Sequence, residues 1–107
     1  MKSTNTMIFA TWEEDDGQEY CDLFYGWEEF NKAFFNPEKE LCRMIPFSVK
    51  GKTYKERQAS LRDTAVEWSN AFMGGLYMSD LANICEWFCK RGRQLGLMRE
   101  FRENAIC

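Results

Sequence analysis

Two short β-prone runs, separated by an acidic segment that contains a glycine, constrain the fold of this chain more than any other feature. Residues 7–12 and 20–25 are rich in aliphatic and aromatic side chains, and Asp16-Gly17 lies between them. An Asp-Gly pair in this position is typical of a two-residue type I′ turn. The sequence therefore predicts an N-terminal antiparallel hairpin whose loop is Asp16 and Gly17.

A two-residue loop fixes which residues of the two runs lie opposite each other. The alternate apolar residues of 8–12 then share one face, which is predicted to be the core face. The second face mixes aromatic and acidic residues, so it is either half covered by the rest of the fold or a contact surface. In this register Glu14 lies opposite Glu19, and like charges in such a pair are destabilising unless a basic partner is present.

The next segment predicts a short helix and a third strand. Apolar residues recur at intervals of three and four across residues 27–34, which indicates a helix that ends before Pro37. Residues 41–49 have strand-like composition. Pro46 lacks an N–H group and so cannot donate to a sheet on that side, which places this strand at an edge or gives it a bulge.

A capping box predicts the start of the longest helix. Thr53 is followed three residues later by Glu56, and apolar residues continue at helical spacing as far as Phe72. The glycines at 74–75 end this helix. Two shorter helices are expected after it, the first of them with Ser79 as its N-cap.

The order of these elements predicts an α+β fold. An N-terminal antiparallel β-hairpin and one further strand pack against three to four helices, in the order ββαβααα. The chain has 107 residues, which is the length of one compact domain over residues 1–107. Apolar residues make up 45% of it and aromatic residues 16%, enough to form a small core rich in rings.

The chain contains no histidine, which excludes Ser-His-Asp and Cys-His catalysis and histidine-bound zinc. Residues 51–53 (Gly-Lys-Thr) match the last part of a phosphate-binding loop motif. Pro46, however, stands where that motif needs its first glycine. No catalytic or cofactor-binding residues are predicted, and the protein is predicted not to be an enzyme. The candidate nucleophiles that remain are the thiols of Cys21, Cys85 and Cys89.

The cysteines allow a zinc site but do not favour one. Cys85 and Cys89 are one helical turn apart, and Cys21 and Cys42 can approach each other from neighbouring strands. Close paired spacings of the zinc-site type are missing, so ordinary packing is the preferred interpretation and a thiol-dependent or zinc-thiolate protein is the third hypothesis. An odd number of cysteines and an N-terminus without a long apolar run indicate a cytoplasmic protein.

The leading hypothesis is a small, non-enzymatic intracellular domain that acts in protein interaction or regulation. Aromatic side chains are concentrated at the centres of protein interfaces, and this chain has 17 of them. The partner is expected to be a protein, a second copy of the chain included. The predicted partner-binding residues are Phe9, Glu13, Glu14, Asp15, Asp16, Tyr20 and Phe24.

The alternative hypothesis is a nucleic-acid-binding regulator. The basic residues that would contact phosphates are Lys90, Arg91, Arg93, Arg99 and Arg102. A formal net charge of −3 disfavours binding to a polyanion, and so does the interruption of this cluster by acidic residues. The longest stretch without a charged residue has 12 residues (68–79), too short to cross a bilayer, so no membrane partner is predicted.

Overall fold

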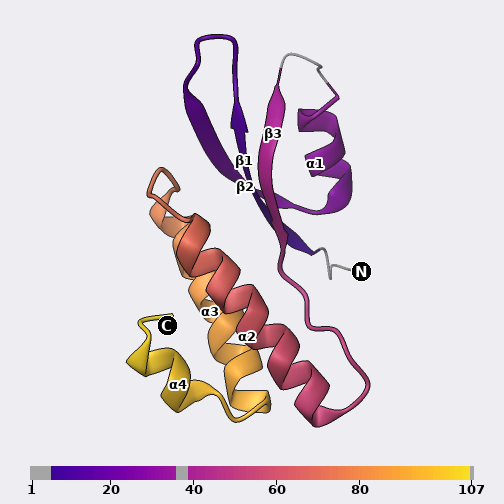
Figure 1. Cartoon of the computed structure of the whole chain (residues 1–107), viewed down its shortest axis with the longest axis vertical. Helices are drawn as coiled ribbons and strands as arrows, with labels where there is room; N and C mark the ends of the chain where they lie inside the picture. Colours follow the sequence, from indigo (N-terminus) through magenta and orange to yellow (C-terminus); the bar gives the residue numbers. More distant parts are fainter. Residues whose placement is uncertain (1–5, 36–38, 107) are drawn as a thin grey trace. The chain divides into compact units, whose positions relative to one another are not determined.

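A computed structural model describes residues 6–35 and 39–106 of the chain (Figure 1). Its elements are β1 (Met7–Glu13), β2 (Glu19–Tyr25), α1 (Trp27–Ala33), β3 (Glu40–Pro46), α2 (Tyr54–Ala71), α3 (Met78–Gln94) and α4 (Met98–Glu103). The predicted α+β order ββαβααα is confirmed. Pro37 lies outside the described residues.

The chain forms two compact units. The sheet unit consists of Met1–Phe47 and Met73–Leu76, and the helical unit consists of Ser48–Phe72 and Tyr77–Cys107. The sheet unit contains the three strands and α1, and the helical unit contains α2, α3 and α4. The organisation of the chain as a single domain stays a prediction.

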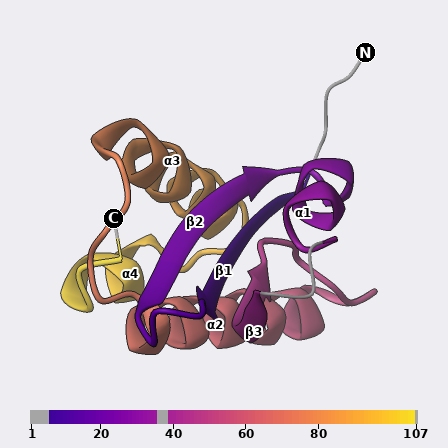
Figure 2. The ribbon, with the colours of Figure 1, turned by 90° about the horizontal axis from the view of Figure 1, so that it is seen from above.

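The sheet has three antiparallel strands in the order β2-β1-β3, with β1 in the middle (Figure 2). The predicted edge position of the strand that contains Pro46 is confirmed. The N–H of Phe47 donates to Met7 O at 2.8 Å, so the nitrogen of the preceding Pro46 faces away from β1. The β1–β3 register shifts between Thr11 and Trp12, and Cys42 is the extra residue of a β-bulge there.

The hairpin loop has three residues, not the predicted two. Glu14 N donates to Gln18 O at 3.2 Å, Gly17 N donates to Glu14 O at 2.9 Å, and Gly17 has a φ of 77°. This is a type I turn followed by a left-handed residue, the usual three-residue hairpin. The longer loop moves the register by one residue and places Ile8 opposite Phe24, so the predicted register is wrong.

The shifted register moves the aromatic residues of β2 to the other face of the hairpin. Phe24 now lies on the same side as Ile8 and Trp12, and it packs against α1 with only 6% of its surface exposed. The core cluster on this face consists of Ile8, Ala10, Trp12, Phe24 and Phe30, with Ala33 and Phe34 packed against it. The prediction that Phe24 lies on a contact surface is therefore wrong.

The other face of β1 is buried as well. Phe9 is fully buried, and its cross-strand neighbours Leu23 and Ile45 are each only 3% exposed. Phe9 was predicted to be a contact residue on an exposed hairpin face, and this is also wrong.

In the helical unit the predicted capping box is present at the start of α2. The N–H of Glu56 donates to Thr53 Oγ1 at 3.1 Å, and the N–H of Thr53 donates to Glu56 Oε1 at 3.0 Å. The N–H of Thr53, together with the N–H of Lys52, which donates to the same oxygen at 3.0 Å, stabilises the carboxylate and lowers the pKa of Glu56 below its usual value. The inward side of α2 is formed by Leu61, Ala65, Trp68 and Ala71.

The predicted cap of the next helix is wrong by two residues. The carbonyl of Tyr77 accepts from Asp80 N and Leu81 N, so α3 begins at Met78 and Ser79 is already in its first turn. Local hydrogen bonding from a serine is only one way to start a helix. Here the extended backbone of Tyr77 serves as the N-cap without a side-chain bond.

A close approach joins α3 to α4. Gly96, with a φ of 68°, ends α3, and the N–H of Leu97 donates to Gly92 O at 2.8 Å in a Schellman motif. A Cβ atom at Gly92 would lie 2.9 Å from a ring carbon of Phe101. The absence of a side chain at Gly92 therefore lets the Phe101 ring pack edge-to-face with Phe88, at 5.8 Å between ring centroids.

Gly17→Ala is expected to lower the free energy of unfolding by about 1 kcal/mol, because alanine resists the left-handed conformation that the loop requires. No atom lies within 4 Å of a Cβ built at Gly17, so backbone strain is the only expected cause. Urea denaturation measures this loss. Gly17→Asn should recover part of it, because asparagine tolerates a positive φ; equal losses in both variants would contradict the left-handed assignment.

Candidate interaction surface

Three glutamates lie side by side at one end of the sheet. Glu13 on β1 is paired with Glu19 on β2 and with Glu40 on β3. Neighbouring strands are about 4.7–4.9 Å apart, so the three carboxylates repel one another along a row. We call Glu13, Glu19 and Glu40 the glutamate row.

The glutamate row has no basic partner within the described part of the chain. None of its carboxylates forms an ion pair with a residue in 6–35 or 39–106. Lys39 is adjacent in sequence to Glu40, but its Nζ lies over the Trp12 ring, 5.3 Å from the ring centroid. All three glutamates are exposed. A cationic group from another molecule can therefore reduce the repulsion within the row.

The adjoining loop holds further acidic groups in fixed positions. Asp16 Oδ2 accepts a 2.6 Å hydrogen bond from the hydroxyl of Tyr20, and Asp16 Oδ1 accepts one from Gln18 N at 3.0 Å. These bonds lower the pKa of Asp16, and the first of them raises the pKa of Tyr20. Trp12 Nε1 donates to Glu14 Oε2 at 2.9 Å. The loop is thus ordered by its own carboxylates.

The structure brings together most of the predicted contact residues, and it adds one. Tyr20 stays 37% exposed and stacks on Trp12 at 6.3 Å. The residues grouped at this end of the sheet are Glu13, Glu14, Asp15, Asp16, Glu19, Tyr20 and Glu40. Phe9 and Phe24 are not part of this surface because they are buried. Sequence reasoning missed Glu40, which no local motif connects to the hairpin.

The zinc hypothesis required the two cysteines of the sheet unit to lie on neighbouring strands, and they do not. Cys21 is on β2 and Cys42 is on β3, with β1 between them. The Cys21 thiol donates to Gly74 O at 3.3 Å. Cys42 is exposed, but partial loss of hydration raises the pKa of its thiol, and the carboxylates of the glutamate row add to this effect. A thiol surrounded by negative charge is a poor nucleophile.

The two cysteines of the helical unit lie one turn apart on α3, as expected. Burial raises the pKa of Cys85, and the neighbouring Cys89 raises it further. Both thiols are partly buried. Across residues 6–35 and 39–106, no three His, Cys, Asp or Glu side chains are grouped so that they could hold a metal ion.

Protein purified without added zinc is expected to contain no stoichiometric zinc, and a chelator should leave its melting temperature unchanged. The reason is that a structural zinc ion needs four convergent ligands and contributes directly to folding. Elemental analysis and thermal denaturation with and without the chelator measure both effects. One zinc per chain would require Cys21, Cys42, Cys85 and Cys89 to converge and would overturn the packing interpretation.

The basic cluster of the nucleic-acid hypothesis is partly neutralised within the helical unit. Lys90 Nζ lies 3.5 Å from Glu86 Oε1, and Arg99 Nε lies 3.6 Å from Glu103 Oε1. The guanidinium of Arg91 lies over the Trp87 ring at 5.4 Å. Arg93 and Arg102 are exposed. These internal contacts reduce the charge that the cluster offers to a polyanion.

Comparison with known proteins found no match among protein-family models, curated proteins or solved structures. In the part of the chain that the structure describes, no helix combines the length and the apolar character needed to cross a membrane.

Proposed function

We propose that this protein is a non-enzymatic interaction or regulatory domain that binds a basic segment of another protein through its acidic hairpin end. The glutamate row is the observation that carries this proposal. Like charges directly opposite each other in a sheet are destabilising, and here two such pairs share Glu13. A partner that brings Lys or Arg to the row relieves both repulsions at once.

The character of the surface favours a protein partner. Tyr20 contributes an exposed ring next to the carboxylates, and tyrosine is enriched in protein interfaces. Arginine suits such a site because its planar guanidinium binds carboxylates and stacks on rings. Self-association through this surface is disfavoured, because it would oppose two acidic rows. A second copy of the chain is thus a weaker candidate than a basic protein.

The test compares two variants of equal charge. In the row variant Glu13, Glu19 and Glu40 become Gln; in the control variant three exposed acids elsewhere change, as Glu28→Gln, Asp63→Asn and Glu67→Gln. A nona-arginine peptide serves as the probe, with affinity measured by calorimetry at low salt. The row variant is expected to bind at least about tenfold more weakly than the wild type, and the control variant to bind nearly as well as the wild type.

Thermal denaturation of the same proteins provides a second measurement. The row variant should melt at a higher temperature than the wild type, because it removes cross-strand repulsion that the control variant leaves in place. Equal affinities of the row variant and the control variant would mean that net charge alone attracts the peptide, and the proposal would fail. Binding of nucleic acid lost on Arg93→Ala and Arg102→Ala would instead favour the alternative hypothesis.

A further inference from the structure

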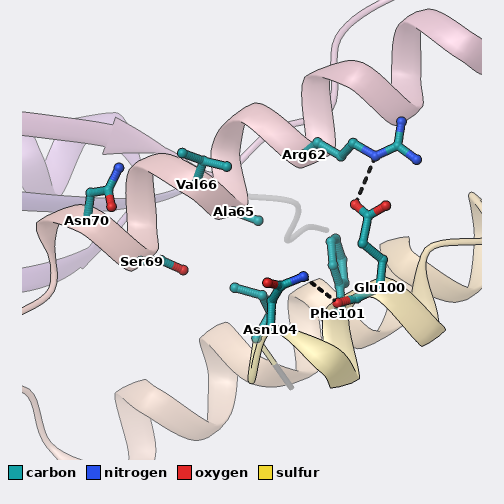
Figure 3. A pocket seen from close by; sticks show the side chains of 9 residues that line it. Arg62, Ala65, Val66, Ser69, Asn70, Glu100, Phe101 and Asn104 are labelled. Carbon is teal, nitrogen blue, oxygen red and sulfur yellow. Dashed lines mark hydrogen bonds and ion pairs between the residues drawn. The ribbon is translucent and has the colours of Figure 1, made fainter.

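The helical unit contains a groove between α2 and α4 that the proposed function does not use (Figure 3). It encloses about 320 Å³, which is at the lower end of the range for small-molecule sites. Its lining includes Arg62, Ala65, Ser69, Glu100, Phe101 and Asn104.

The hollow exists because a small residue faces the other helix at its centre. Ala65 and Ser69 of α2 are directed toward α4, where Phe101 and Asn104 lie (Figure 3). Ala65 is 5% exposed and Phe101 is 2% exposed, so they form an apolar floor, and Val66, 58% exposed, stands at the mouth. A flat ring can lie on this floor and cover apolar surface there.

The charges of the groove are already balanced. Arg62 Nε donates to Glu100 Oε2 at 2.8 Å, and this bond raises the pKa of Arg62. A charged ligand would therefore find no unpaired charge of opposite sign among the lining residues that the structure describes. An uncharged ligand avoids the cost of burying a charge.

Polar groups remain to orient the ligand. The Asn104 amide donates its Nδ2–H to Glu100 O at 2.9 Å, which leaves its carbonyl oxygen as an acceptor. The Ser69 hydroxyl makes no hydrogen bond to any residue in 6–35 or 39–106, and it can both donate and accept. A ligand that both donates and accepts a hydrogen bond next to a ring matches this pair.

From this combination we propose that the α2–α4 groove binds a small, uncharged aromatic amide. Its ring lies on the floor formed by Ala65 and Phe101, beside Val66, and its amide meets Ser69 and Asn104. This binding is independent of the acidic hairpin end, because all lining residues belong to the helical unit.

Benzamide is the probe, and the full chain labelled with ¹⁵N is titrated with it while backbone amide shifts are recorded by NMR. Saturable shifts are expected in residues 62–70 and 100–106, with a dissociation constant of about 1 mM, as befits a ligand of this size. Benzoate, which has the same ring but a charge, should bind about tenfold more weakly. Absence of saturable shifts at groove residues, or equal binding of benzoate, would overturn the proposal.

Two variants separate the groove from other surfaces. Ala65→Leu fills the groove and should abolish the shifts, whereas Ala82→Leu, the same change at an exposed position of α3, should preserve them. Ser69→Ala changes no packing and should weaken benzamide binding about threefold to tenfold through the loss of one hydrogen bond, which keeps the test valid even where Ala65→Leu fails to fold. Unchanged affinity in Ser69→Ala would contradict the proposed orientation.

Discussion

Replacing Phe24 with alanine is expected to lower the free energy of unfolding by about 3–5 kcal/mol. Phe24 is 6% exposed, and its ring lies 5.7 Å from that of Phe30 and 5.8 Å from that of Phe34, both edge-to-face. The Trp12 ring is a third neighbour, at 6.2 Å. Loss of this ring leaves a cavity beneath α1. The expected loss is a large fraction of the total free energy of unfolding of a small domain, which is about 5–15 kcal/mol. Urea denaturation followed by circular dichroism measures it.

Phe35→Ala is the matched control for this experiment. It removes the same side chain from a position that is 89% exposed in the same unit, so its effect on stability should stay within about 0.5 kcal/mol. A small effect of Phe24→Ala, below about 1 kcal/mol, would mean that the ring is on the surface after all. That result would restore the two-residue loop and the register that goes with it.

Trp68→Ala is expected to have an effect of similar size, about 3–5 kcal/mol, in the helical unit. Trp68 is 8% exposed, and its ring stacks on Phe72 at 4.7 Å with an interplanar angle of 21°. It also follows Leu61 and Ala65 along the buried side of α2. Its removal takes the largest ring from that side of the helix. Chemical denaturation measures the loss as a shift of the unfolding midpoint.

Val66→Ala provides the comparison on the same helix. Val66 is 58% exposed and lies two residues from Trp68, so its truncation should change stability by no more than about 0.5–1 kcal/mol. Similar losses in the two variants would show that the helix buries a different face. The loss of unfolding free energy is expected to be several-fold larger for Trp68→Ala than for Val66→Ala. This comparison therefore tests which face of α2 is buried as well as the contribution of Trp68 to the core.

Local signals in the sequence were sufficient for the type and order of the elements. The Thr53–Glu56 capping box and the missing N–H of Pro46 each act within a few residues, and each has the predicted effect. The glycines at 74–75 do not end α2 themselves, because the helix already stops at Ala71, with Phe72 in extended conformation as its C-cap. The hairpin was also recognised, but its register was not. Whether Asp16-Gly17 forms a two-residue loop or the end of a three-residue loop depends on where Gly17 adopts its left-handed conformation. Twist and packing of the whole sheet influence that choice.

The candidate sites depend on contacts between residues far apart in the sequence. Glu40 joins Glu13 only because β3 pairs with β1, and its own neighbours in sequence give no sign of this. The groove depends on Ala65 facing Phe101 across two helices, and a small residue in a helix has no distinctive signal. Burial of Phe9 and Phe24 likewise follows from tertiary packing, which overrides the local alternation of polar and apolar residues.

The bulge at Cys42 and the outward nitrogen of Pro46 have a consequence for how this protein behaves at high concentration. An incoming strand that tries to extend the sheet at β3 meets a missing donor at Pro46 and a local twist at Cys42. Its approach to the other end of β3 is opposed by the charge of Glu40 and its neighbours in the row. Growth of the sheet into a fibril by strand addition is therefore blocked on the β3 side at both ends.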